Sequence, residues 1–216
     1  MNMELILIRH AQSKGNKDNI VQGQTDEGLS ELGKEQADLL SKYFDTAKIT
    51  AIYSSDLGRA FQTAEPTAKK LKLEIKTDPD LREADFGIWE GLTYDEVKQN
   101  FQKDYDAWHK NYYTRPHWFE SFQSHFERVK RAIEKILISH SLHDRVLVFT
   151  HGGSLKTQVG FFKILNGEEL TSFSNTNCSL TLLKFNPSKN YKDGEIIYFN
   201  KQVIQTKNPH LKPDPL

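Results

Sequence analysis

The chain has 216 residues, of which 29 are lysine or arginine and 29 are aspartate or glutamate, so its formal net charge is zero. This length suits one sizeable α/β domain, and the balanced charge argues against a general nucleic-acid or membrane-surface binder. We find no pattern of a signal peptide or a membrane-spanning segment. The single cysteine, Cys178, cannot form an internal disulfide, so we expect a protein of the cytoplasm.

The first predicted element is a buried strand. Residues 5–8 are four consecutive aliphatic residues, followed directly by Arg9 and His10. A run without alternation is typical of a strand covered on both faces, as in a parallel sheet. Ligands of such sheets bind outside the carboxyl ends of the strands. The small and polar residues that follow, as far as Asn16, allow the backbone to approach a ligand closely.

Helices and strands then alternate. Leucines at helical spacing predict a helix over residues 31–44, and residues 51–54 are typical of a short strand. Residues 54–56 (Ser-Ser-Asp) are expected to cap the next helix, which Pro66 should kink or restart. A weaker strand is predicted over residues 73–76.

The middle of the chain is predicted to be helical. Residues 93–96 form a capping box, and apolar residues continue at helical spacing from there to Trp108. A loop is expected over residues 111–117 and a long helix over residues 121–139. We interpret residues 93–121 as a helical insertion over the active site.

A second strongly apolar strand is predicted over residues 145–150. It ends in His151 and two glycines, and a helix is expected to begin near Ser154. Two further strands, residues 179–185 and 195–199, have no helix between them, so we expect an antiparallel extension of the sheet.

Together these elements predict an α/β fold, a three-layer α/β/α sandwich with a mostly parallel central sheet. No repeat or linker interrupts the pattern. We expect one domain over residues 1–205 and a flexible tail over residues 206–216.

Two apolar strands thus end in histidines, His10 and His151, which would meet at one edge of the sheet. A lone histidine there would more often be a satisfied core residue. A metal site is a second alternative, but Arg9 and Arg59 would repel a cation and no zinc-like spacing is present. An anion site fits better, because guanidinium groups suit phosphate. Arg59 also lies in the first turn of a predicted helix, where anions bind.

Four segments, in order, resemble the motifs of the histidine phosphatase (phosphoglycerate mutase-like) superfamily. They are residues 7–13 (LIRHAQS) with Asn16, residues 53–64 (YSSDLGRAFQTA), residues 81–91 (LREADFGIWEG) and residues 150–155 (THGGSL). They span most of the chain. The chain looks most like the broad-specificity phosphatase branch, and the resemblance implies the phosphoglycerate mutase-like fold.

The resemblance also implies roles for the matching residues. His10 would be the nucleophile that forms a phosphohistidine, and Glu83 would be the general acid that protonates the leaving alkoxide. Arg9, Arg59 and a protonated His151 would bind the phosphoryl oxygens, whose negative charge they would stabilise. Further phosphate contacts are expected from Asn16, Gln22, Gly23 and Gly152. We expect no metal and no cofactor, a phosphorylated small molecule as substrate, and a monomer or homodimer.

Three functions stay open, and we prefer phosphomonoester hydrolysis. The insertion is rich in aromatic residues, which suit a roomy, partly apolar leaving-group site, although each could instead pack the helices onto the sheet. A cofactor-dependent phosphoglycerate mutase is the first alternative, and it would need extra cations such as Lys103, Lys110 and Arg115. A non-catalytic phospho-ligand binding module is the second, although His10 and Glu83 are present.

Two departures from the family pattern affect the phosphate pocket. Ala11 stands where the family usually has glycine, and we expect it to be tolerated if the backbone there does not need a positive φ. Residues 25–28 lack the usual proline, which leaves the conformation of that loop open.

Overall fold

The computed structural model describes residues 2–44, 48–165, 174–186 and 188–204. The predicted tail, residues 206–216, lies outside the described residues. Three short 3-10 turns occur at Pro79–Leu81, Gly87–Trp89 and Tyr191–Asp193. The strands and helices are, in chain order, β1 (Met3–Arg9), α1 (Lys14–Lys17), α2 (Glu31–Tyr43), β2 (Ala51–Ser54), α3 (Gly58–Leu71), β3 (Ile75–Thr77), α4 (Tyr94–Asn100), α5 (Gln102–Lys110), α6 (Phe122–Ser139), β4 (Arg145–Thr150), α7 (Gly152–Leu165), β5 (Leu180–Phe185) and β6 (Gly194–Lys201).

The strands form one six-stranded sheet in the order β3-β2-β4-β1-β5-β6. The first four are parallel to their neighbours, and β5 and β6 extend the sheet in antiparallel pairing. This arrangement confirms the predicted α/β fold and its antiparallel extension. Among the described residues, no helix is long and apolar enough to cross a membrane.

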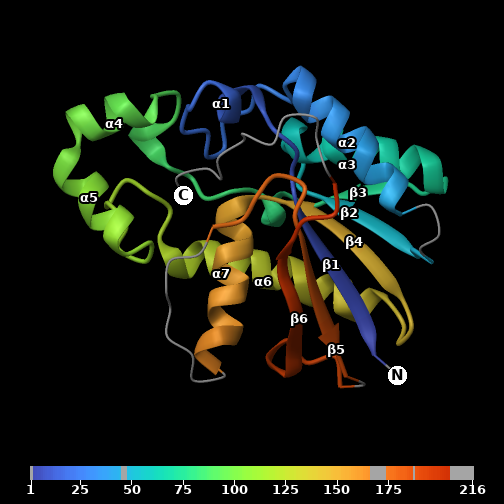
Figure 1. The fold of residues 1–216 in the computed structure, drawn as a ribbon. Coiled ribbons are helices and arrows are strands. Elements are labelled where there is room, and N and C mark those ends of the chain that lie inside the picture. The colour runs from blue at the N-terminus through green and yellow to red at the C-terminus, as the bar shows by residue number, and fades with distance from the viewer. Residues whose placement is uncertain (1, 45–47, 166–173, 187, 205–216) are drawn as a thin grey trace.

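Helices cover both faces of the sheet, as Figure 1 shows. Leu5 and Leu7 of β1 pack in the cluster that includes α6 and α7, whereas Ile6 and Ile8 pack in the cluster that includes α2 and α3. All four side chains are buried. Burial of one such side chain stabilises the fold by about 1.5–3 kcal/mol. The unbroken aliphatic run is therefore explained by a strand with two apolar faces, as predicted.

The register of the two central strands sets the position of the site. Arg9 pairs with Thr150 in the parallel ladder between β1 and β4. The next residue on each strand is a histidine, so His10 and His151 leave the sheet side by side at its carboxyl edge.

The insertion differs from the prediction of one continuous helix. The capping box at Thr93 opens α4 as predicted, but Phe101 adopts φ −135° and separates α4 from α5. The Phe101 ring packs 6.2 Å from Trp89 and 6.0 Å from Trp118, measured between ring centroids. This packing belongs to a third apolar cluster, whose buried members are Val21, Ala84, Phe86, Trp89, Val97, Trp108 and Phe119.

Two further local predictions are corrected. Helix α3 runs through Pro66 as a single element, so the predicted restart is wrong. Helix α7 begins at Gly152, two residues before the predicted start at Ser154. Its N-terminus therefore follows His151 directly, which places the positive end of the helix dipole at the edge of the site.

Candidate active site

His10 follows β1 and is only 3% exposed. Its Nδ1 lies 2.7 Å from the backbone oxygen of Ala11. A carbonyl oxygen can only accept, so Nδ1 carries the proton and Nε2 keeps its lone pair. Burial, followed by the charges of Arg59 and Arg9, holds the pKa of His10 well below its usual value. The side chain is therefore a neutral imidazole at neutral pH, with one nitrogen able to act as a nucleophile.

His151 lies beside His10, with 5.2 Å between the ring centroids and 58° between the ring planes. It is fully buried, and neither ring nitrogen has a hydrogen-bond partner among the described residues. Burial, and next the charge of Arg59, holds the pKa of His151 well below its usual value. The protonated form expected from the sequence is thus disfavoured here, because desolvation and nearby cations oppose a further positive charge.

Arg9 is fixed by a residue that the sequence analysis missed. Its guanidinium donates to the backbone oxygen of Asn175 at 2.5 Å and to the Asn175 side-chain oxygen at 3.3 Å. The Asn175 amide in turn donates to the Gly152 oxygen at 2.9 Å. One loop residue therefore ties the end of β1 to the start of α7. Asn175 lies in an irregular segment, where no periodic signal could have indicated it.

Arg59 lies in the first turn of α3 and is 1% exposed. Its guanidinium donates to the backbone oxygens of Gly23 at 2.6 Å and Thr25 at 2.8 Å. Its Nε has no partner among the described residues. Because Gly23 adopts φ +53°, its conformation suits glycine, and it acts through the carbonyl that orients Arg59.

The N-terminus of α3 is capped from a distance, not by residues 54–56 as predicted. The Asp26 carboxylate accepts hydrogen bonds from the backbone N–H groups of Gly58 and Arg59, the second at 3.2 Å. It also lies 3.4 Å from the Arg59 guanidinium. Asp56 instead pairs with Arg82 at 2.5 Å. Capping by a residue of an upstream loop leaves no local pattern in the sequence.

Glu83 is 7% exposed, and both oxygens of its carboxylate accept backbone hydrogen bonds. Oε1 accepts from the Ala84 N–H at 2.9 Å, and Oε2 accepts from the Gly153 N–H at 2.8 Å. Arg128 of α6 donates to the backbone oxygens of Arg82 and Glu83, both at 2.7 Å. These contacts hold the carboxyl group over the start of α7.

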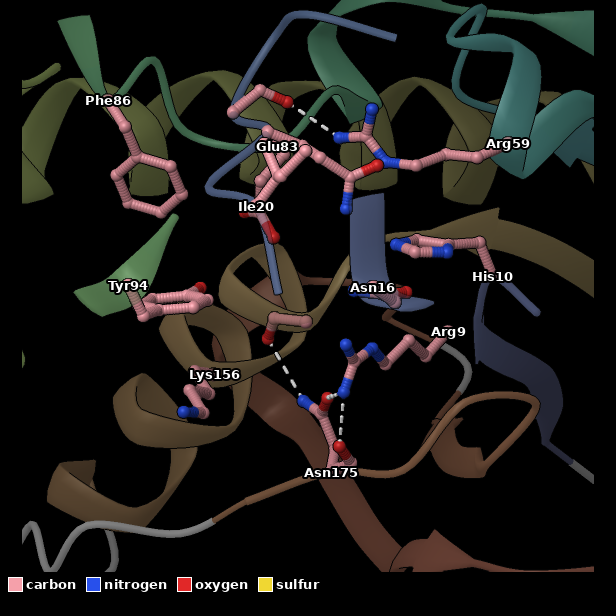
Figure 2. A pocket seen from close by; sticks show the side chains of 13 residues that line it. Arg9, His10, Asn16, Ile20, Arg59, Glu83, Phe86, Tyr94, Lys156 and Asn175 are labelled. Carbon is pink, nitrogen blue, oxygen red and sulfur yellow. Dashed lines mark hydrogen bonds between the residues drawn. The ribbon is translucent and has the colours of Figure 1, made fainter. Parts of the chain in front are cut away.

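A pocket brings most of the predicted residues together. In Figure 2, Arg9, His10 and Arg59 lie on one side, while Phe86, Tyr94 and Lys156 lie on the other. The lining residues are Arg9, His10, Asn16, Ile20, Gln22, Gly23, Arg59, Glu83, Phe86, Tyr94, Gly152, Lys156 and Asn175. Eight of the nine predicted residues are in this set. The ninth, His151, is not a lining residue, but its ring lies 5.2 Å from that of His10.

The far side of the pocket differs from the expectation of an aromatic leaving-group site built by the insertion. Tyr94 is the residue of the insertion that lines it, and Phe86, Ile20 and Lys156 come from other segments. Most aromatic residues of the insertion pack against one another in the third cluster. Lys156 was missed because a lysine within a helix carries no signal of its own.

The two departures noted in the sequence are resolved in part. Ala11 is not among the residues with positive φ, so alanine fits there as expected, and its N–H donates to Thr63 Oγ1 at 2.9 Å. In the loop of residues 25–28, Gly28 adopts φ +75°.

Among the described residues, no group of three or more His, Cys, Asp or Glu side chains could hold a metal ion.

Fold and pocket together define an α/β protein with a buried, neutral histidine in a cationic pocket at the carboxyl edge of its sheet. The chain belongs to the histidine phosphatase superfamily (branch 1), whose family model matches residues 5–193.

Relatives within this family include proteins named as phosphatases and proteins named as mutases. The chain is 31% identical over 198 residues to putative phosphoserine phosphatase 2 of Hydrogenobacter thermophilus, covering 91% of this chain and 95% of the relative. It is 32% identical over 190 residues to phosphoglycerate mutase-like protein 4 of Arabidopsis thaliana, covering 78% and 82%. A solved mycobacterial glucosyl-3-phosphoglycerate phosphatase complexed with VO3 matches with a TM-score of 0.80 at 25% identity, covering 92% and 99%.

Proposed function

We propose that the protein is a phosphomonoesterase for small phosphorylated metabolites, which acts through a phosphohistidine on His10 with Glu83 as general acid. The observation that carries this proposal is the state of His10, a neutral imidazole whose Nδ1 proton is held by the Ala11 oxygen, so that Nε2 keeps its lone pair. His10 lines the same pocket as Arg9, Arg59 and Glu83. The family membership of the chain supports the same chemistry.

In the first step, Nε2 of His10 attacks phosphorus and the bond to the leaving oxygen breaks. Glu83, in its carboxylic acid form, donates its proton to that oxygen, because an alkoxide is a poor leaving group. In the second step, water attacks the phosphohistidine and gives its proton to the Glu83 carboxylate. The N–P bond breaks, and inorganic phosphate and the neutral imidazole are regenerated.

The cationic side of the pocket would stabilise the charge on the transferring phosphoryl group. Arg9, Arg59 and the N-terminus of α7 supply preorganised donors. The N–H of the neutral His151 ring and Nε of Arg59, which lack partners among the described residues, are suited to donate to phosphoryl oxygens. Loss of one such donor typically costs about 3–4 kcal/mol of transition-state stabilisation.

The substrate side of the pocket supports hydrolysis over phosphoglycerate mutation. A mutase needs further cations for a carboxylate and a second phosphate. Lys103, Lys110 and Arg115 of the insertion are outside the pocket lining, which leaves Lys156 as the one further cation among the lining residues that the structure describes. Ile20, Phe86 and Tyr94 offer a mixed apolar surface that accommodates varied leaving groups.

Hydrolysis of p-nitrophenyl phosphate in the presence of a chelator tests this proposal. We expect turnover by the native protein, its loss in His10→Ala, and a stoichiometric, acid-labile and base-stable phosphoenzyme after a rapid quench. Retained turnover in His10→Ala, or phosphate binding without turnover of any phosphomonoester, would contradict it. The second result would identify a binding module.

A parallel assay separates the hydrolase from the mutase, the alternative suggested by relatives with mutase names. Phosphoglycerate is supplied with and without a bisphosphate primer. We expect phosphate release to exceed isomerisation in both cases. Primer-dependent isomerisation much faster than phosphate release would assign the chain to the mutases.

A further inference from the structure

His125 is a fully buried histidine of α6 that lies outside the pocket lining. Its Nδ1 lies 3.3 Å from an Arg115 guanidinium nitrogen, and its Nε2 lies 2.9 Å from Ser154 Oγ. Burial, followed by the charges of Arg128 and Arg115, holds the pKa of His125 well below its usual value. The ring is therefore neutral, although it sits among charged residues.

The direction of each hydrogen bond follows from what the groups can do. A guanidinium only donates, so Nδ1 accepts from Arg115 and Nε2 must carry the ring proton. Nε2 therefore donates to the Ser154 hydroxyl oxygen. The Ser154 hydroxyl in turn donates to the backbone oxygen of Arg82 at 2.9 Å. The result is a one-way chain from the insertion, through α6 and α7, to the residue before Glu83.

This chain ends on the supports of Glu83. Arg82 directly precedes Glu83, and Ser154 directly follows Gly153, whose N–H donates to Glu83 Oε2. The ring of His125 also approaches the carboxylate, with 3.8 Å between Nε2 and Glu83 Oε1. The His125 imidazole therefore lies beside the Glu83 carboxylate. Through Ser154 it also fixes the backbone of Arg82 and the start of α7, the two segments that support Glu83.

We propose that His125 is a positioning residue for Glu83, which it holds through Ser154 and Arg82 at the distance that proton donation to the leaving group requires. The inference rests on the role of Glu83 proposed above. A misplacement of about 1 Å at a reacting group can cost roughly 100-fold in rate. Arg115 ties this support to the insertion, because it also donates to the backbone oxygen of Glu120 at 2.8 Å.

The test uses two substrates that differ in their need for the acid. p-Nitrophenolate leaves readily without a proton, whereas the alkoxide from β-glycerophosphate does not. The comparison uses kcat/KM, which reports formation of the phosphoenzyme and leaves out its hydrolysis, the step common to both substrates. We expect His125→Phe and Ser154→Ala to lower kcat/KM on β-glycerophosphate by roughly 10-fold or more, within the range of general-acid effects, and to change kcat/KM on p-nitrophenyl phosphate by less than about 3-fold. His125→Gln, whose amide can still donate to Ser154, should recover part of the lost activity.

Tyr191→Phe is the matched control. Tyr191 donates to Gln158, one turn beyond Ser154 on the same helix. The Gln158 amide also donates to Thr157 Oγ1 and to the Phe126 backbone oxygen, but in the part of the chain that the structure describes neither the Tyr191 nor the Gln158 side chain hydrogen-bonds to His125, Ser154 or Glu83. The substitution removes a buried hydrogen bond at the interface of α6 and α7 and should leave the ratio of the two rates unchanged. An equal loss on both substrates in His125→Phe and Ser154→Ala, or no loss on either, would overturn the positioning role.

Glu83→Gln, tested in parallel, separates the two proposals. If Glu83 is the acid, this variant shows the same selective loss on β-glycerophosphate, to a greater extent. If Glu83→Gln lowers kcat/KM equally for both substrates, the general-acid assignment fails, and the inference about His125 fails with it. A selective Glu83→Gln beside a non-selective His125→Phe overturns the inference alone.

Discussion

Gly23 shows how a single residue can orient an arginine of the candidate site through its backbone. Its φ of +53° turns the carbonyl toward Arg59, and a Cβ at this position would lie 1.9 Å from a Glu90 carboxylate oxygen. That oxygen accepts hydrogen bonds from Gln24 and Phe86, so it cannot easily move. Any side chain at Gly23 therefore meets both backbone strain and a collision.

We expect Gly23→Ala to lower the free energy of unfolding by about 2–4 kcal/mol and to lower kcat/KM strongly, because the Arg59 acceptor is displaced. Gly91→Ala is the control, since Gly91 also has a positive φ, +86°, but a Cβ there meets nothing within 4 Å. Gly91→Ala should lower the free energy of unfolding by about 1 kcal/mol through backbone strain alone and should keep near-native activity. Urea unfolding and phosphatase assays measure both, and equal effects of the two variants would contradict this account.

At the scale of the element, residues far apart in the sequence support the short turns at the site. Helix α3 carries Arg59, yet its first N–H groups are capped by Asp26 from a loop that precedes α2. The cap, the arginine and the loop therefore form one unit.

Asp26→Ala should lower the free energy of unfolding by about 1–2 kcal/mol, as expected for loss of an N-cap, and should lower kcat because Arg59 loses an anionic partner. Asp26→Asn keeps an acceptor and should restore most of the stability. Asp56→Ala removes only a partly exposed ion pair and should cost less than about 1 kcal/mol. Thermal unfolding tests this order, and an Asp56→Ala variant less stable than Asp26→Ala would refute it.

The contrast between these elements explains what the sequence could predict. The strands β1 and β4 and the helices α2 and α6 carry continuous apolar patterns, so they and the histidines that follow the strands were predicted closely. The break at Phe101, the cap from Asp26 and the clamp by Asn175 depend on contacts between distant segments. Such contacts leave no periodicity in a single sequence.

At the scale of the whole molecule, buried neutral histidines link stability to pH, and three of them lie in the part of the chain that the structure describes. His10, His125 and His151 have pKa values well below the usual 6.5, chiefly because of burial. Below pH 6.5 the unfolded chain therefore binds more protons than the folded one, and stability must fall as the pH falls. The stability that these neutral histidines contribute is fully present above pH 6.5. It is lost as the pH falls from 6.5 toward their pKa values in the folded protein.

We expect the free energy of unfolding to be lower at pH 5.5 than at pH 7.5 by up to about 4 kcal/mol, since each histidine that stays neutral contributes about 1.4 kcal/mol one pH unit below its unfolded pKa. Urea titrations at the two pH values measure this difference. His125→Gln removes one titrating group and should reduce the pH effect by about a third. A free energy independent of pH over this range would rule out the neutral assignment.

The pairing of β1 with β4 also determines when activity can appear during folding. Arg9 and Thr150 are neighbours in the sheet although most of the chain lies between them. Contacts between residues so far apart in the sequence form late, because the chain loses the entropy of closing a long loop before these contacts can stabilise it. A growing chain that has not yet released residues 145–165 holds His10 but neither His151 nor the helix that supports Glu83. The candidate site is thus incomplete in partly made chains, and its completion coincides with the completion of the sheet.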